Sequence, residues 1–272
     1  MKPELRQYFR LNRLPHIWCP GCGNGIVVGA LVRAIHDQGL NQDEVVIVSG
    51  IGCSSRASGY LDFNTVHTVH GRALAFATGI KLANPKLTVF VLMGDGDAAA
   101  IGGNHLIHAA RRNIDLKAIV FNNSIYGMTG GQVSPLTPQG KRATTAPYGV
   151  VANAFDLTEL AKGAGATFVA RGTAYHVVQL TDLLKQGIRH KGFSLVEAVT
   201  QCPVAYGRQN KPADPDKMLR WQKENAVNIR NRHKYSQEEL EGKFLTGVLC
   251  KKDATEFTEG YQHLRDLLDS HE

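Results

Sequence analysis

The 272-residue sequence has no apolar run near the ~20 residues that a membrane-spanning helix needs, which argues against a membrane protein. Residues 1–8 lack the apolar core of a secretory signal, so we expect a cytoplasmic protein. No G-x-G-x-x-G opens a helix, which disfavours NAD as the electron acceptor. The net charge of +7 comes without a nucleic-acid recognition motif, so we expect no nucleic-acid partner. The cysteines number five, and an odd count in a cytoplasmic chain favours metal or redox chemistry over disulfides.

Strand-like and helix-like segments alternate along the chain. Short apolar runs predict buried strands at residues 44–49, 87–93, 116–121, 167–171 and 193–199. Helical periodicity predicts helices at residues 24–38, 71–83, 101–112, 157–162 and 174–189. This alternation predicts an α/β fold, a mostly parallel sheet with helices on both faces.

Two regions depart from this pattern. Residues 124–150 are rich in glycine and proline and predict a long loop, which in a compact domain usually serves function. After residue 202 the sequence becomes polar and basic. We therefore expect an α/β domain over residues 1–202 and a basic, mainly helical extension over residues 203–272. Its helices are expected around 216–230 and 261–268.

Polar side chains follow two neighbouring predicted strands. The segment Gly94-Asp95-Gly96-Asp97 follows the first, and Asn122-Asn123 follows the second. Ligands bind at the carboxyl ends of strands in open α/β sheets, and Mg²⁺ takes carboxylates together with phosphate oxygens. A GDG motif with NN at this spacing, in a strand–helix–strand frame, is typical of thiamine diphosphate (ThDP) enzymes. The sequence therefore predicts a domain that binds the diphosphate of ThDP through Mg²⁺.

The cysteines suggest a second metal centre. Cys19 and Cys22 form a C-x-x-C, Cys53 follows a predicted strand, and Cys202 follows the last one. Four thiolates can hold either a [4Fe–4S] cluster or a zinc ion, and the cysteines alone leave both open. A redox pair of Cys19 and Cys22 is a further alternative, although it would not use the other two. Cys250 lies in the charged tail, and we expect it to have no role.

Longer stretches resemble a known family. Residues 18–25 (WCPGCGNG), 49–54 (SGIGCS), 67–81, 94–97 and 122–132 resemble the short β subunit of 2-oxoacid:ferredoxin oxidoreductases. The likeness extends over residues 14–206 and is strongest to the 2-oxoglutarate enzyme. It implies ThDP, Mg²⁺ and a [4Fe–4S] cluster as cofactors. It also implies CoA-dependent oxidative decarboxylation of a 2-oxoacid, or the reverse carboxylation.

The resemblance also implies roles for individual residues. Cys19, Cys22, Cys53 and Cys202 match the cluster ligands. Asp95, Asn123 and the backbone carbonyl of Ile125 match the Mg²⁺ ligands. The positions that match ThDP contacts are Ile51, Gly52, Cys53, Ser54, His70, Gly96, Asp97, Gly127 and Met128. Arg56 stands where relatives carry a basic residue near the substrate, so Arg56 and His70 are the catalytic candidates. Gly130 departs from relatives that have lysine there.

The implied partners are an α subunit, in an αβ or (αβ)₂ assembly, and ferredoxin. The α subunit is expected to supply the carboxylate that activates ThDP. Residues 203–234 hold eight Lys or Arg against three Asp or Glu, a net +5 that would attract an acidic ferredoxin. Two rival functions remain. A non-oxidative ThDP enzyme would leave the cysteines unused, and a non-enzymatic electron-transfer subunit would leave the diphosphate site unused.

Overall fold

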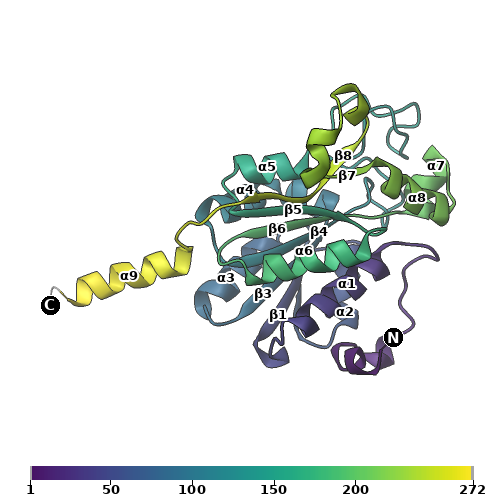
Figure 1. Ribbon diagram of the computed structural model, residues 1–272. Coiled ribbons are helices and arrows are strands. Elements are labelled where there is room, and N and C mark those ends of the chain that lie inside the picture. Colours follow the sequence, from purple (N-terminus) through teal and green to yellow (C-terminus); the bar gives the residue numbers. More distant parts are fainter. Residues whose placement is uncertain (1, 271–272) are drawn as a thin grey trace.

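One twisted sheet organises the computed structural model, which describes residues 2–270 (Figure 1). Its strand order is β2-β1-β3-β4-β6-β5-β8-β7. The strands are β1 (Val45–Ser49), β2 (Asn64–His67), β3 (Thr88–Gly94), β4 (Leu116–Asn122), β5 (Phe168–Thr173), β6 (Ser194–Val199), β7 (Ala226–Asn228) and β8 (Phe244–Lys251). From β2 to β5 all neighbours are parallel, and only β8 runs antiparallel to its neighbour β5. The predicted α/β fold is confirmed.

Helices cover both faces of the sheet. One core packs β-strand side chains against α1 (Asn24–Asp37), α2 (Ala57–Tyr60) and α6 (Val177–Arg189). The other core lies beneath α3 (Ala73–Ala83), α4 (Gly103–Arg112) and α5 (Leu157–Gly163). The central strands β3 and β4 are buried on both faces, which explains their continuous apolar sequence.

Segments outside the expected pattern lie at the two sheet edges. The short edge strand β2 is exposed or half-exposed throughout, so its sequence contains no apolar run that would predict a strand. The helix expected over residues 216–230 ends early, because α8 covers Pro215–Asn225 and β7 follows at once. Residues 203–272 therefore supply strands as well as α7 (Arg208–Asn210), α8 and α9 (Phe257–Asp269). A domain boundary at residue 202 stays a prediction.

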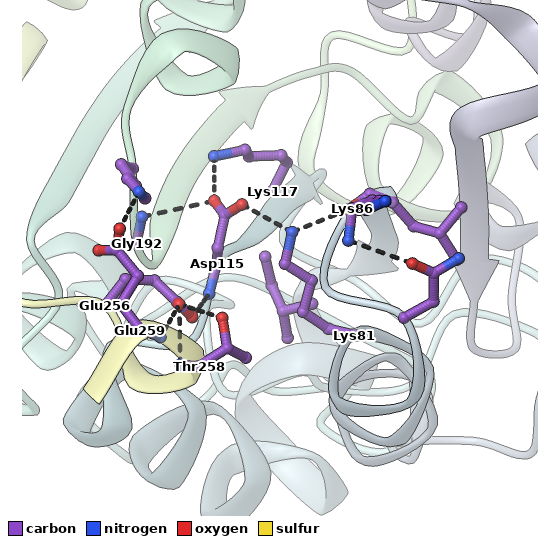
Figure 2. A network of polar contacts seen from close by, with 12 residues as sticks. Lys81, Lys86, Asp115, Lys117, Gly192, Glu256, Thr258 and Glu259 are labelled. Atoms are coloured by element: carbon purple, nitrogen blue, oxygen red, sulfur yellow. Dashed lines mark hydrogen bonds and ion pairs between the residues drawn. The ribbon is translucent and has the colours of Figure 1, made fainter. Parts of the chain in front are cut away.

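A buried polar network fastens the start of α9 to the sheet (Figure 2). The Asn113 side chain donates to the carbonyls of Ala254 and Thr255, and the Asp115 N–H donates to Glu256 at 2.9 Å. The Glu256 side chain is buried and caps the first turn of α9. The Asp115 carboxylate in turn binds two buried lysines, Lys81 and Lys117. The helix therefore leaves the body from a fixed point (Figure 1).

Among residues 2–270, no helix has both the length and the apolar character that crossing a bilayer requires.

Candidate functional site

A cavity of about 470 Å³ lies at the carboxyl ends of β1, β3 and β4. It is lined by the residues expected to bind ThDP and Mg²⁺: Ile51, Gly52, Cys53, Ser54, His70, Asp95, Gly96, Asp97, Asn123, Ile125, Gly127 and Met128. Four segments far apart in the chain thus meet at one place, because parallel strands end at the same edge of the sheet. Two of the lining residues, Ile51 and Met128, are partly exposed at 39% and 44%, so the cavity opens to the surface.

Asp95 ends the buried strand β3 and points into this cavity. Its carboxyl is 2% exposed and accepts a hydrogen bond from the Ser134 hydroxyl. Burial raises the pKa of Asp95 from 3.8 to about 7, although hydrogen bonds from Ser134 and from backbone N–H groups oppose the shift. No salt bridge joins Asp95 to a cationic side chain within residues 2–270. A bound cation would offset the cost of ionising this buried acid.

Asp97 ties together the loops that follow β1 and β2. Its Oδ1 accepts from the Gly71 N–H at 2.6 Å and from the Ile51 N–H at 3.5 Å. The His70 Nδ1 lies 2.8 Å from the same oxygen, at an angle that falls short of a hydrogen bond. Burial raises the pKa of Asp97, while the Gly71 N–H and His70 oppose that rise. Asp97 therefore shapes the cavity wall by holding its loops in place.

Gly96 allows a close approach that no other residue permits. A β-carbon at position 96 would lie 2.2 Å from the ring of Tyr126, whose hydroxyl donates to the Gly96 carbonyl at 3.1 Å. The Tyr126 ring also meets His70 edge-on, with centroids 5.8 Å apart. Sequence reasoning missed Tyr126 and Ser134, because both come from the long irregular segment and contact the motif only in the fold.

Two of the four expected cluster cysteines meet beside the cavity. A β-carbon on Gly127 would lie 3.5 Å from Cys202 Sγ and 3.8 Å from Cys53 Sγ. Burial raises the pKa of Cys53 to about 11 and that of Cys22 to about 12, and the charges of the other thiols of this set add to both shifts. The pKa of Cys202 is also raised by burial, and backbone N–H groups of residues 204–206 oppose that rise. The four thiols therefore lie close enough to influence one another.

The fifth cysteine lies elsewhere. Cys250 sits on β8, where its thiol contacts the Ala166 carbonyl and packs against the core beneath α3, α4 and α5. Among residues 2–270, no three His, Cys, Asp or Glu side chains are close enough to share one metal ion. The four sulfurs are therefore spread too widely for a single zinc ion as they stand.

Arg56 does not join the site. It lies in the short helical turn Ser54–Arg56 with an exposed side chain, and it does not line the cavity. Arg56 does influence His67: burial lowers the pKa of His67, and the positive charge of Arg56 lowers it further. Cys19, Cys22 and Cys202 also lie outside the cavity lining, and of these Cys202 lies beside Gly127.

Comparison with known proteins defines the class. The family model for the thiamine pyrophosphate enzyme, C-terminal TPP binding domain, matches residues 20–198. The chain is therefore a ThDP-binding enzyme domain, as its sequence predicted.

Individual relatives narrow the class further. The chain is 55% identical over 245 residues to the 2-oxoglutarate synthase subunit KorB of Methanothermobacter marburgensis, covering 90% of this chain and 86% of that one. It is 52% identical to the corresponding subunit of Methanocaldococcus jannaschii, covering 99% of this chain and all of that one. One chain of the 2-oxoglutarate:ferredoxin oxidoreductase from Magnetococcus marinus, solved with 2-oxoglutarate, coenzyme A and succinyl-CoA bound, superposes with a TM-score of 0.88. It is 34% identical, and the match covers 99% of this chain and 91% of that one.

The chain belongs to the family of 2-oxoglutarate synthase KorB subunits, the β subunits of oxidoreductases that act on 2-oxoacids. The family resemblance inferred from the sequence motifs is confirmed.

Proposed function

We propose that this chain is the ThDP- and cluster-binding subunit of an oxidoreductase for 2-oxoglutarate. In the forward direction the enzyme takes 2-oxoglutarate, CoA and oxidised ferredoxin to succinyl-CoA, CO₂ and reduced ferredoxin. The observation that carries the proposal is the single cavity where Asp95 and Asn123 meet Cys53. A site with only diphosphate chemistry would not need a thiol, and a site for electron transfer alone would not need the GDG and NN motifs.

The oxygen ligands at this cavity fit Mg²⁺. Asp95 would supply a carboxylate, Asn123 an amide oxygen and Ile125 a backbone carbonyl, which is the hard donor set that Mg²⁺ prefers. Gly96 is packed against Tyr126, whereas a β-carbon on Gly52 would meet nothing within 4 Å, so the open backbone at Gly52 leaves room for a diphosphate. Bound ThDP supplies the carbon nucleophile that adds to the keto carbon of the 2-oxoacid and allows CO₂ to leave. The protein's part is to position that group, while hydrogen bonds from Ser134 and from backbone N–H groups favour the ionised form of Asp95 that would bind the metal.

The sulfur ligands fit a [4Fe–4S] cluster better than zinc. Each thiolate of such a cluster binds a different iron, so the four sulfurs stand further apart than around one zinc ion. That spacing agrees with the absence of a shared single-ion site in the described chain. The backbone N–H groups of residues 204–206 around Cys202 would stabilise a thiolate. A cluster supplies one-electron steps, which match an acceptor such as ferredoxin and not NAD⁺.

The cavity needs a partner subunit to become a complete site. Its lining contains the carboxylates of Asp95 and Asp97 but no glutamate. Asp95 accepts from Ser134, and Asp97 holds two loops through Oδ1, with only its buried Oδ2 unpaired in the described chain. We therefore propose that the carboxylate that activates ThDP comes from the α subunit. Ferredoxin as the acceptor, the αβ or (αβ)₂ assembly and a cytoplasmic location stay predictions.

Reconstitution tests this function. The purified chain alone and its complex with the α subunit would be assayed anaerobically for reduction of ferredoxin, with 2-oxoglutarate or pyruvate and with CoA present or absent. We expect turnover only in the complex, only with CoA, and with preference for 2-oxoglutarate. Appreciable turnover by the single chain would refute the shared site, and preference for pyruvate would refute the substrate.

A further inference from the structure

A second and larger cavity, of about 600 Å³, lies on the other side of β4 from the cofactor cavity. Its floor is the carboxyl ends of β4, β5 and β6, and its walls are the long loop before α5 and the segment from Tyr206 to Phe244. The two cavities share only Asn123 among their lining residues. The volume lies within the range of ~300–1,000 Å³ that small-molecule sites occupy.

Two lysines are brought together at this cavity by a reciprocal clamp. The Asn210 side chain accepts from the Arg142 N–H at 2.7 Å and donates to the Arg142 carbonyl at 2.8 Å. The clamp joins two distant segments directly beside Lys141 and Lys211, which both line the cavity. Neither lysine forms an ion pair within residues 2–270. Their charges are therefore free to meet an anion.

The backbone at Lys211 is held in an unusual conformation. Its φ is +37°, a value that L-residues other than glycine rarely adopt. Such strain persists only where the surroundings impose it, and it is concentrated at ligand sites. The 2.8 Å bond from the Lys211 N–H to the Gly207 carbonyl and the neighbouring Asn210 clamp are the contacts that impose it here.

Aromatic side chains form the opposite wall. Trp221 is 49% exposed and Phe155 is 53% exposed, although both line the cavity. The Trp221 ring packs on Phe244 with centroids 5.8 Å apart. Its neighbour Gln222 is buried and fastens α8 to the sheet by accepting from the Tyr175 N–H and donating to Gln201. These rings are thus held in place with a face available for stacking.

The charged groups on the cavity floor are already paired, whereas the buried Thr200 hydroxyl has no hydrogen-bond partner in the described chain. Arg171 binds Glu197 and Asp156, each at 2.6 Å, and Asn122 donates to Glu197 at 2.6 Å. The amides of Gln201 and Gln222 are likewise bonded within the protein. The free features of the cavity in the described chain are therefore two cations, a set of aromatic faces, the Thr200 hydroxyl and the Asn123 amide nitrogen.

We propose that this cavity binds the nucleotide moiety of a ligand, with the base stacked on Trp221 and Phe155 and the phosphates on Lys141 and Lys211. Because stacking on an aromatic ring tolerates every base, the site discriminates weakly among bases. The moiety could come from a free nucleoside diphosphate or from the nucleotide end of coenzyme A. The inference concerns a different cavity from that of the proposed function, and only its coenzyme A alternative rests on that function.

Calorimetric titration of the assembled oxidoreductase, saturated with ThDP and Mg²⁺, tests the site. ADP, GDP and UDP are expected to bind once per chain with affinities within a few-fold of one another. Adenosine, which lacks phosphates, and inorganic pyrophosphate, which lacks a ring, are each expected to bind at least ~10-fold more weakly, because stacking and charged hydrogen bonds each contribute that much. Equal affinities for pyrophosphate and ADP would show that the base makes no stacking contact, and would overturn the proposal.

Variants locate the binding. The double variant Lys141→Gln/Lys211→Gln and the single variant Trp221→Leu are each expected to weaken ADP at least ~10-fold. Lys86→Gln, an exposed lysine at the opposite end of the sheet, is the matched control and should change nothing. Unchanged ADP affinity in the cavity variants overturns the proposal. Loss of subunit assembly on gel filtration also overturns it, because the cavity would then be an interface.

Competition between ADP and coenzyme A for the cavity distinguishes the two sources of the nucleotide. If coenzyme A displaces ADP and the lysine variant raises the KM for coenzyme A without changing kcat, the cavity holds the nucleotide end of coenzyme A. If coenzyme A fails to displace ADP, the ligand is a free nucleotide. The site is supported in both cases.

Discussion

Replacing Asp95 by asparagine should stabilise the cofactor-free chain while abolishing its response to ThDP and Mg²⁺. The carboxyl lies 2% exposed at the end of β3, with no cationic side chain paired to it in the described chain. An ionised carboxylate there is poorly solvated until a metal binds. Asparagine keeps the shape and the oxygen that accepts from Ser134, but it carries no charge.

The magnitude follows from the pKa. Burial raises the pKa of Asp95 from 3.8 to about 7, so the folded state binds this proton more tightly than the unfolded state does. The resulting penalty is absent below pH ~4, grows as the pH rises towards 7, and is constant above that. At ~1.4 kcal/mol per pKa unit the full shift is worth up to ~4 kcal/mol. If relaxation of the site halves this destabilisation, ~2 kcal/mol remains. For a chain of this size that corresponds to about 4–8 °C in Tm.

Thermal melting of the purified chain from pH 5 to pH 8 is the assay, with and without ThDP and Mg²⁺. Without cofactor, Asp95→Asn should melt above the wild type at pH 8, and the gap should narrow towards pH 5. With cofactor, only the wild type should gain stability. Asp43→Asn, at an exposed position, is the control and should show neither effect. A variant that melts lower than the wild type at pH 8, or one that still responds to ThDP, would refute the reasoning.

Three further changes test other parts of the structure. Cys202→Ser should lower the iron and sulfide content of anaerobically purified protein, whereas Cys250→Ser on β8 should not, and equal losses would contradict the ligand set. At Gly127 a β-carbon alone would already be in van der Waals contact with Cys202 Sγ, at 3.5 Å, so the larger Gly127→Val should reduce the iron-to-protein ratio while circular dichroism shows an unchanged fold. Glu256→Ala removes the buried cap of α9 and should cost about 1–3 kcal/mol. Faster hydrogen exchange confined to residues 257–269 would show this loss, and unchanged exchange would disprove it.

The sequence predicted the centre of the fold well, because the centre is where local pattern and tertiary environment agree. Strands β3 and β4 are buried on both faces, so their apolar runs mark them directly. The GDG and NN motifs follow those strands at once, and a parallel sheet must bring both ends to one edge. The sequence alone therefore predicts that Asp95 and Asn123 lie close together, and both line one cavity.

The parts that escaped prediction depend on contacts between segments with no local signature. The edge strand β2 has no apolar run, and β8 has one that Gly247 interrupts, within a segment expected to be mainly helical. Ser134 and Tyr126 belong to an irregular segment, and only the folded chain shows that they contact Asp95 and Gly96. Arg56 was placed near the substrate by resemblance alone, and the chain by itself leaves it exposed outside the cavity.

The strand order explains why the loop after β4 matters to both cofactors. Cys53 follows β1 and Cys202 follows β6, and the order β1-β3-β4-β6 separates these strands by two others. Their sulfurs can approach each other only across the ends of β3 and β4, where the segment after Asn123 runs. Gly127 lies in that segment and has both sulfurs within 4 Å of the place where its side chain would begin. The loop that carries Asn123 and Ile125 along the cavity therefore also lies against Cys53 and Cys202, so the proposed diphosphate and cluster sites are neighbours, and we expect a short electron path between them.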